Sequence, residues 1–264
     1  MSLDNLYQLP VYWISLAIFF VLLASCVLGI LVGQARQHKG GGDNSGNESL
    51  VAALLGIMGL VLAFTYSYNL SRLDTRKAAV VQEANAAGTA FLRADLLPAT
   101  ERQELQTLIR DYTASRIFRN IDMNRPESVR EAIDETLELQ SRLWPSAFSL
   151  SEGRLEPPER TFLLGSINDL IDAHTVRLAA ARDRMPPAVF YFTLAVAVAA
   201  LFVSGNNAGI DGQRPVLRLT IYSFVLAIVN ALILDFDQTS NGLVRLSAAP
   251  IIAALADMNA VLGQ

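Results

Sequence analysis

The chain has 264 residues, of which 52% are hydrophobic and 17% are charged, with a net charge of −4 and a mean hydropathy of +0.34. Because soluble domains carry about 25% charged residues, this composition excludes an ordinary soluble protein and predicts an integral membrane protein. The negative net charge and the lack of a basic stripe with interleaved aromatic residues also exclude nucleic acid as a partner.

Four uninterrupted apolar stretches are long enough to cross a membrane as helices. They cover residues 11–33, 50–68, 187–204 and 216–234, and the last has one charge, Arg218, near its start. A helix rises about 1.5 Å per residue, so a hydrocarbon core of about 30 Å needs about 20 residues. Buried helices of a large soluble protein would keep a polar face. We therefore expect an all-α membrane protein with four transmembrane helices.

The distribution of basic residues predicts the topology. The N-terminal residues lack the Lys and Arg of a signal peptide, so we expect the first span to stay in the mature protein as an anchor. With four spans, both termini and the middle segment share one side of the membrane. Near the span ends that side carries Arg72, Arg76, Lys77, Arg182, Arg184 and Arg245, and the other carries Arg36, Lys39, Arg214 and Arg218. This excess predicts a cytoplasmic location for the shared side.

Four parts of the chain follow from these spans. Residues 1–68 hold the first two transmembrane helices and their loop, and residues 69–186 form a cytoplasmic helical domain. Residues 187–234 hold the third and fourth transmembrane helices, and residues 235–264 form a cytoplasmic C-terminal tail.

The middle segment is expected to be a helical bundle. No proline interrupts the chain between the second span and Pro98, so the second span should continue as one long helix. Thr100 and Gln103 have the spacing of a capping box and predict a helix to about Arg119, with Leu105, Leu108, Ile109 and Tyr112 on one apolar face. A further helix is expected from about Pro126 until Pro145 stops it. Apolar residues at helical spacing predict a last helix from about Pro158.

The fourth span is followed by an Asp-x-Asp-x-Thr motif that resembles the nucleophile site of haloacid-dehalogenase-type phosphotransferases. In those enzymes the aspartate ends a short buried strand, whereas Asp235 follows an apolar run of helical length. The motif also fits a calcium loop poorly, because Ser240 and Leu246 occupy the positions of its glycine and its bidentate glutamate. Asp235 and Asp237 remain an acidic pair at a helix end, either solvating that end or attracting ions.

No catalytic constellation is found in the sequence. His38 and His174 are isolated, and the single cysteine, Cys26, lies inside the first span. Metalloprotease, nucleophile-elbow and phosphate-loop motifs are lacking. We therefore expect a protein that is not an enzyme and that needs no cofactor.

Two segments carry a resemblance to a known family. The stretch "LLGIMGLVLAFTYSYNLSRLDTRKAAVVQEANAAGTAFLRADLLP" and the stretch "LILDFDQTSNGLVRLSAAPI" resemble the bestrophin-like domain family of bacterial membrane proteins. This family is distantly similar to the bestrophins, which are homopentameric ion channels with cytoplasmic ends. In bestrophins the second span lines a hydrophobic neck, and an acidic cluster after the fourth span joins a calcium clasp. The acidic run is shorter in this chain.

The resemblance implies an oligomeric ion channel, with the second span lining the pore, in a bacterial inner membrane. The implied partners are the lipid bilayer, inorganic ions and further copies of the chain, a pentamer by resemblance. The pore-lining candidates are Leu60, Phe64, Thr65, Ser67, Tyr68 and Asn69, and the candidates for ion attraction or metal binding are Asp235 and Asp237. The alternative is a membrane-anchored scaffold or sensor whose cytoplasmic helices bind a protein partner.

Overall fold

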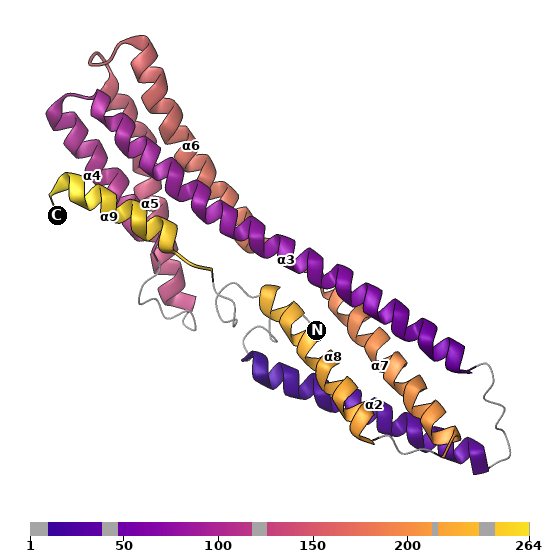
Figure 1. Ribbon diagram of the computed structural model, residues 1–264. Coiled ribbons are helices and arrows are strands. Elements are labelled where there is room, and N and C mark those ends of the chain that lie inside the picture. The colour runs from indigo at the N-terminus through magenta and orange to yellow at the C-terminus, as the bar shows by residue number, and fades with distance from the viewer. Residues whose placement is uncertain (1–9, 39–46, 118–125, 213–215, 238–245, 264) are drawn as a thin grey trace. The chain divides into compact units, whose positions relative to one another are not determined.

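The computed structural model describes residues 10–38, 47–117, 126–212, 216–237 and 246–263. Every element within these ranges is helical (Figure 1). The elements are, in chain order, α2 (Val11–His38), α3 (Asn47–Arg93), the 3₁₀ helix η1 (Ala94–Leu96), α4 (Ala99–Ser115), α5 (Pro126–Ser151), α6 (Pro157–Arg182), α7 (Pro187–Ile210), α8 (Val216–Asp237) and α9 (Ala249–Leu262).

Four helices, α2, α3, α7 and α8, carry stretches long and apolar enough to cross a membrane. The four predicted spans are therefore confirmed. The second span continues without a break to Arg93, which confirms the predicted long helix. The run ends at the turn of η1 before Pro98, and no proline between Asn47 and Leu97 interrupts it earlier.

The chain divides into two compact units, and the boundaries lie inside α3 and directly after α6. Met1–Leu73 and Arg184–Arg245 form the membrane unit, and Asp74–Asp183 and Leu246–Gln264 form the bundle unit. The expected membrane limits after residues 68, 186 and 234 concern the position of the bilayer, and they stay a prediction.

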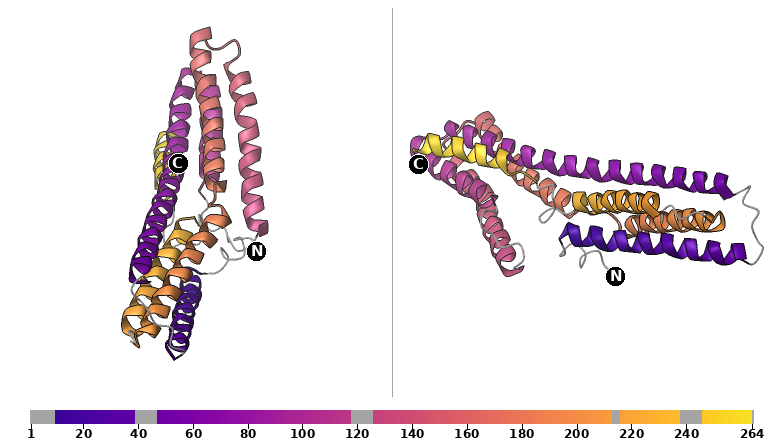
Figure 2. Two further views of the ribbon diagram at one scale, coloured as in Figure 1. Left: turned by 90° about the vertical axis from the view of Figure 1, so that its right-hand side faces the viewer. Right: turned by 60° about the horizontal axis from the view of Figure 1, so that its bottom comes forward.

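In the membrane unit, α2 packs along α7 and α8, and these helices lie side by side in both views of Figure 2. Their shared core also takes in Met58 and Leu62 from α3. The core contains one buried side chain about every helical turn of α2, namely Ile14, Ile18, Leu22 and Cys26. This spacing gives α2 a continuous contact face.

Four glycines bring α2 and α7 into close backbone contact. Gly29 and Gly33 of α2 face Gly205 and Gly209 of α7, and a Cβ atom built on any of them would overlap the backbone of the opposite helix. In lipid, where water does not drive apolar surfaces together, such close packing is the main attraction between helices. The crossing of the first and third spans is thus set by glycine.

The bundle unit is built from the second part of α3 with α4, α5, α6 and α9. Contacts run from α4 to α5, from α5 to α6 and from α4 to α9. The core is formed by Phe91, Leu105, Ile109, Tyr112, Leu143, Leu163, Ile167, Leu170 and Met258. The expected helical bundle is therefore present, with Leu105, Leu108, Ile109 and Tyr112 of α4 turned inward.

Two local expectations were wrong. Pro145 does not stop a helix, because α5 continues through it to Ser151; Leu143 and Ala147 on either side are fully buried, and this packing outweighs one lost backbone hydrogen bond. Thr100 does not cap α4, because the N-cap of this helix is Pro98. The last residue of α4 is Ser115. The predicted end at Arg119 lies outside the described residues. The expected tail also contains a helix, α9.

Candidate functional site

The exposed face of the second span is the first feature that could serve transport. Leu60, Phe64 and Tyr68 are 56%, 66% and 54% exposed on the subunit. Residues four apart in a helix advance by about 40° around its axis, so the three side chains form one slightly slanted stripe. Ser67 is exposed as well and lies beside this stripe. We call these four residues the α3 stripe.

Thr65 and Asn69 lie on a different face of α3 and are buried inside the membrane unit. The Thr65 hydroxyl donates to the carbonyl of Val61 at 2.8 Å. The Asn69 amide donates to the carbonyl of Thr65 at 2.9 Å and contacts the Met185 sulfur at 3.4 Å. The structure therefore separates the six candidates into the exposed stripe and two residues that are buried within their own subunit.

The acidic pair at the end of α8 is also buried. Asp235 and Asp237 are 0% and 2% exposed. One Asp237 oxygen accepts the backbone N–H of Met185 at 2.9 Å and lies 3.7 Å from a guanidinium nitrogen of Arg72. Among the described residues, no group of three or more His, Cys, Asp and Glu side chains could hold a metal ion. Asp237 thus has a positively charged side chain as its neighbour.

Arg72 connects the acidic pair to the α3 stripe. Its guanidinium lies 4.9 Å from the centre of the Tyr68 ring, one helical turn earlier on α3. It also donates to the carbonyl oxygen of Arg184 at 2.7 Å. The sequence analysis used Arg72 only as one of the basic residues that set the topology. The sequence could have indicated this role, because Arg72 lies one turn after Tyr68, at a predicted membrane edge that also carries the acidic pair.

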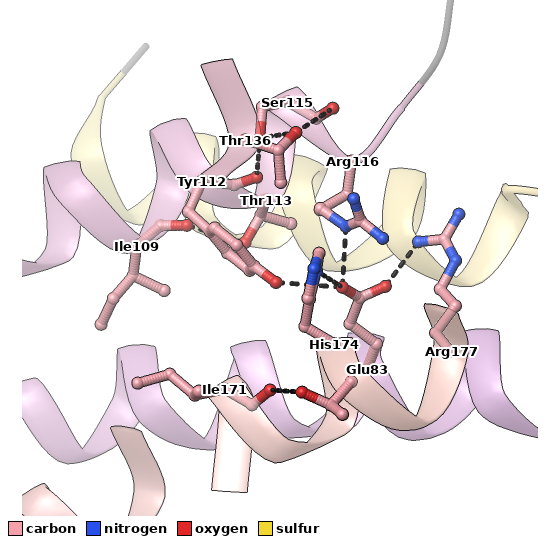
Figure 3. Close-up of polar contacts among 11 residues, drawn as sticks. Glu83, Ile109, Tyr112, Thr113, Ser115, Arg116, Thr136, Ile171, His174 and Arg177 are labelled. Atoms are coloured by element: carbon pink, nitrogen blue, oxygen red, sulfur yellow. Dashed lines mark hydrogen bonds and ion pairs between the residues drawn. The ribbon is translucent and has the colours of Figure 1, made fainter. Parts of the chain in front are cut away.

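A second polar cluster lies in the bundle unit, around Glu83 of α3 (Figure 3). The Glu83 carboxylate accepts hydrogen bonds from the Tyr112 hydroxyl at 3.0 Å, from Arg116 at 2.8 Å and from Arg177 at 2.5 Å. His174 Nδ1 lies 3.7 Å from the same carboxylate. These partners come from α4 and α6, so one buried anion ties three helices together.

The charges in this cluster follow from its surroundings. Burial by itself raises the pKa of Glu83, but the nearby His174 ring and the charges of Arg116 and Arg177 outweigh burial and lower this pKa to about 2. Burial and the Glu83 anion raise the pKa of the Tyr112 hydroxyl far above its ordinary range. At neutral pH the cluster is therefore a carboxylate held by a protonated tyrosine and two arginines, as expected of a structural ion-pair network.

Comparison with known proteins identifies the family. The model of the bestrophin-like domain matches residues 16–251, which is most of the chain. The chain belongs to the bestrophin-like family. No curated protein matches this bestrophin-like chain.

Solved structures agree with this bestrophin-like fold. A bacterial bestrophin homologue from Klebsiella pneumoniae superposes with a TM-score of 0.70 at 13% identity, covering 94% of this chain and 98% of that one. The structure of a variant described as a membrane protein gives a TM-score of 0.70 at 15% identity, covering 94% and 99%. At such low identity the likeness establishes the fold, and the roles of individual residues have to be argued from this chain.

Proposed function

We propose that this bestrophin-like protein is an ion channel in which several copies of the chain surround a pore lined by the α3 stripe. The observation that carries the proposal is the exposure of the second span. Only 17% of the residues in its most apolar 18-residue stretch are buried, compared with 33–39% in the other three spans. Of the four spans, the second therefore leaves the largest part of its surface for contacts outside the subunit.

The chemistry of the stripe suits a pore better than a surface facing lipid. Ser67 presents an exposed hydroxyl on this face, and a hydroxyl at membrane depth needs a hydrogen-bonding partner, which water in a pore supplies. In a ring of subunits, Leu60 and Phe64 would form stacked apolar rings that can close by excluding water. Tyr68 would follow at the C-terminal end of the span.

The remaining parts of the proposal come from the family. By resemblance the assembly is a pentamer in a bacterial inner membrane, with both termini and the bundle unit in the cytoplasm. Its partners are lipid, inorganic ions and the other copies of the chain. The protein acts by passing ions and not by catalysis. Thr65 and Asn69 are buried within their own subunit and do not line the pore in this proposal.

The test is ion flux into liposomes that contain the purified protein, measured for several cations and anions. We expect flux from the wild type, and a higher basal flux from Phe64→Ala, because removing the largest ring of the stripe widens the apolar constriction. The matched control is Phe192→Ala on α7. Phe192 is 57% exposed on the subunit, close to the 66% of Phe64, but lies on another span, so its removal should leave flux unchanged.

Two results would contradict the proposal. The first is a wild-type protein that is monomeric in detergent and passes no ion, as expected of a membrane-anchored scaffold. The second is a Phe64→Ala protein that stays oligomeric and conducts like the wild type, which would remove the second span from the pore.

A further inference from the structure

We propose that Arg72 and Asp237 form a charge-balanced pair that positions Tyr68 at the C-terminal end of the α3 stripe. The pair would thereby contribute to the selectivity of the pore between cations and anions. The role in selectivity rests on the proposed channel function. The pairing and the positioning of Tyr68 rest on the contacts within the membrane unit alone.

The guanidinium of Arg72 is held on three sides. It donates to the Arg184 carbonyl at 2.7 Å, lies 3.7 Å from Asp237 and stacks 4.9 Å from the centre of the Tyr68 ring. Arg72 is 9% exposed and the Asp237 side chain is fully buried. Three chain segments, α3, the residues before α7 and the end of α8, therefore meet at one side chain.

Arginine is suited to this arrangement. Its planar guanidinium can face a carboxylate and a carbonyl with its edge and an aromatic ring with its flat side. A cation within about 6 Å of a ring centre is attracted to the face of that ring. Tyr68 is 54% exposed, and the stacked cation restricts the positions that its half-exposed ring can take. Asp237 in turn keeps Arg72 in place, because its carboxylate lies 3.7 Å from the guanidinium.

The charges of the pair are opposite, and this leads to a signed prediction. Removing Asp237 makes the charge near Tyr68 more positive by one unit, whereas removing Arg72 makes it more negative by one unit. An ion in water at physiological salt, roughly 8 Å from one such charge, changes in local concentration by about 1.4-fold. Because cations and anions change in opposite directions, the local cation-to-anion ratio changes by about twofold. The two single variants should therefore shift the permeability ratio in opposite directions.

The experiment compares Arg72→Gln, Asp237→Asn and the double variant with the wild type in liposomes. We expect the cation-to-anion permeability ratio to fall about twofold in Asp237→Asn, to rise about twofold in Arg72→Gln and to return close to the wild-type value in the double variant. Tyr68→Leu removes the ring but keeps both charges. This variant should alter the conductance and leave the cation-to-anion permeability ratio close to the wild-type value. If Asp237 only solvated the end of α8, Asp237→Asn would leave the permeability ratio unchanged, and this result would contradict the proposal.

Melting in detergent tests the pairing without any flux. Each single variant should melt below the wild type because it leaves one buried charge without its partner. The decrease in melting temperature of the double variant should be smaller than the sum of the decreases in the two single variants. Calcium should leave the melting temperature of the wild type unchanged, because Arg72 already supplies the cation at Asp237. Arg72→Met, which also removes the charge but keeps an unbranched side chain, replaces Arg72→Gln if the latter does not fold.

The outcomes separate this inference from the channel proposal. A wild type without flux refutes the channel and with it the role in selectivity, and the melting temperatures then decide the pairing. Additive losses in melting temperature would refute the pairing. Shifts of the permeability ratio in the same direction in both single variants, or a calcium-dependent melting temperature that disappears in Asp237→Asn, would overturn the inference even if the channel conducts.

Discussion

The crossing of α2 and α7 makes the strongest quantitative prediction about stability. In Gly29→Ala the new Cβ would lie 2.9 Å from the backbone nitrogen of Asn206 and would overlap the Phe202 carbonyl. Favourable contacts between heavy atoms lie at about 3.5–4.0 Å. The two helices must therefore separate by roughly 0.5–1 Å, because both sides of the contact are backbone and neither can rotate away.

The cost of this separation can be estimated from the contacts that it loosens. A fully buried side chain such as Leu22, which is 0% exposed on α2, makes about 40–60 atomic contacts worth about 0.1–0.2 kcal/mol each. A gap of 0.5–1 Å removes a quarter to a half of each contact, and overpacked sites usually cost about 1–3 kcal/mol. Alanine regains up to about 1 kcal/mol of helix propensity. We expect a net loss of about 2 kcal/mol, or about 4–8 °C in melting temperature.

The assay is thermal unfolding of the purified protein in detergent, with Gly59→Ala as the matched control. A Cβ at Gly59 of α3 would meet no atom within 4 Å, so this variant should melt at or slightly above the wild-type temperature. The reasoning would be refuted if Gly29→Ala melted with the wild type, or if Gly59→Ala lost as much as Gly29→Ala.

Three further predictions concern the bundle unit and the topology. Glu83→Gln removes the anion that Arg116 and Arg177 contact and should cost about 3–5 kcal/mol in chemical denaturation. The pKa of Glu83 is lowered from 4.5 to about 2 in the folded protein, so its contribution is complete above pH 4.5 and is lost as the pH falls toward 2; the loss of stability over this range should be smaller in Glu83→Gln. Tyr112→Phe removes one hydrogen bond to a buried charge and should cost about 1.5–3 kcal/mol, and an unchanged unfolding midpoint would contradict this contact. A reporter fused after Gln264 should read as cytoplasmic, and an external reading would overturn the topology.

Parts of this fold could be predicted from the sequence because they depend on local chemistry. An apolar run of about 20 residues has to become a helix in lipid, where each backbone polar group needs a partner within its own segment. The continuation of α3 to Arg93 likewise followed from the lack of any proline between Asn47 and Leu97. The inward face of α4, with Leu105, Ile109 and Tyr112, followed from helical spacing.

Other features depended on packing between distant segments. Helical spacing places Phe64 and Thr65 about 100° apart on α3, but it does not say which of the two faces the neighbouring helices cover. Helix α5 continued through Pro145 because Leu143 and Ala147 are buried against other helices. Local propensity could not predict that compensation.

The charged groups show the same division most clearly. From the sequence, Asp237 and Arg72 were an acidic residue at one helix end and one of several basic residues near another, and Glu83 was one more polar residue on a long helix. A charge is stable in a buried position only when a partner is close, and that partner usually comes from a remote part of the chain. The tertiary structure therefore decided that Asp237 lies beside Arg72, that Arg72 stacks on Tyr68, and that Glu83 joins α3 to α4 and α6.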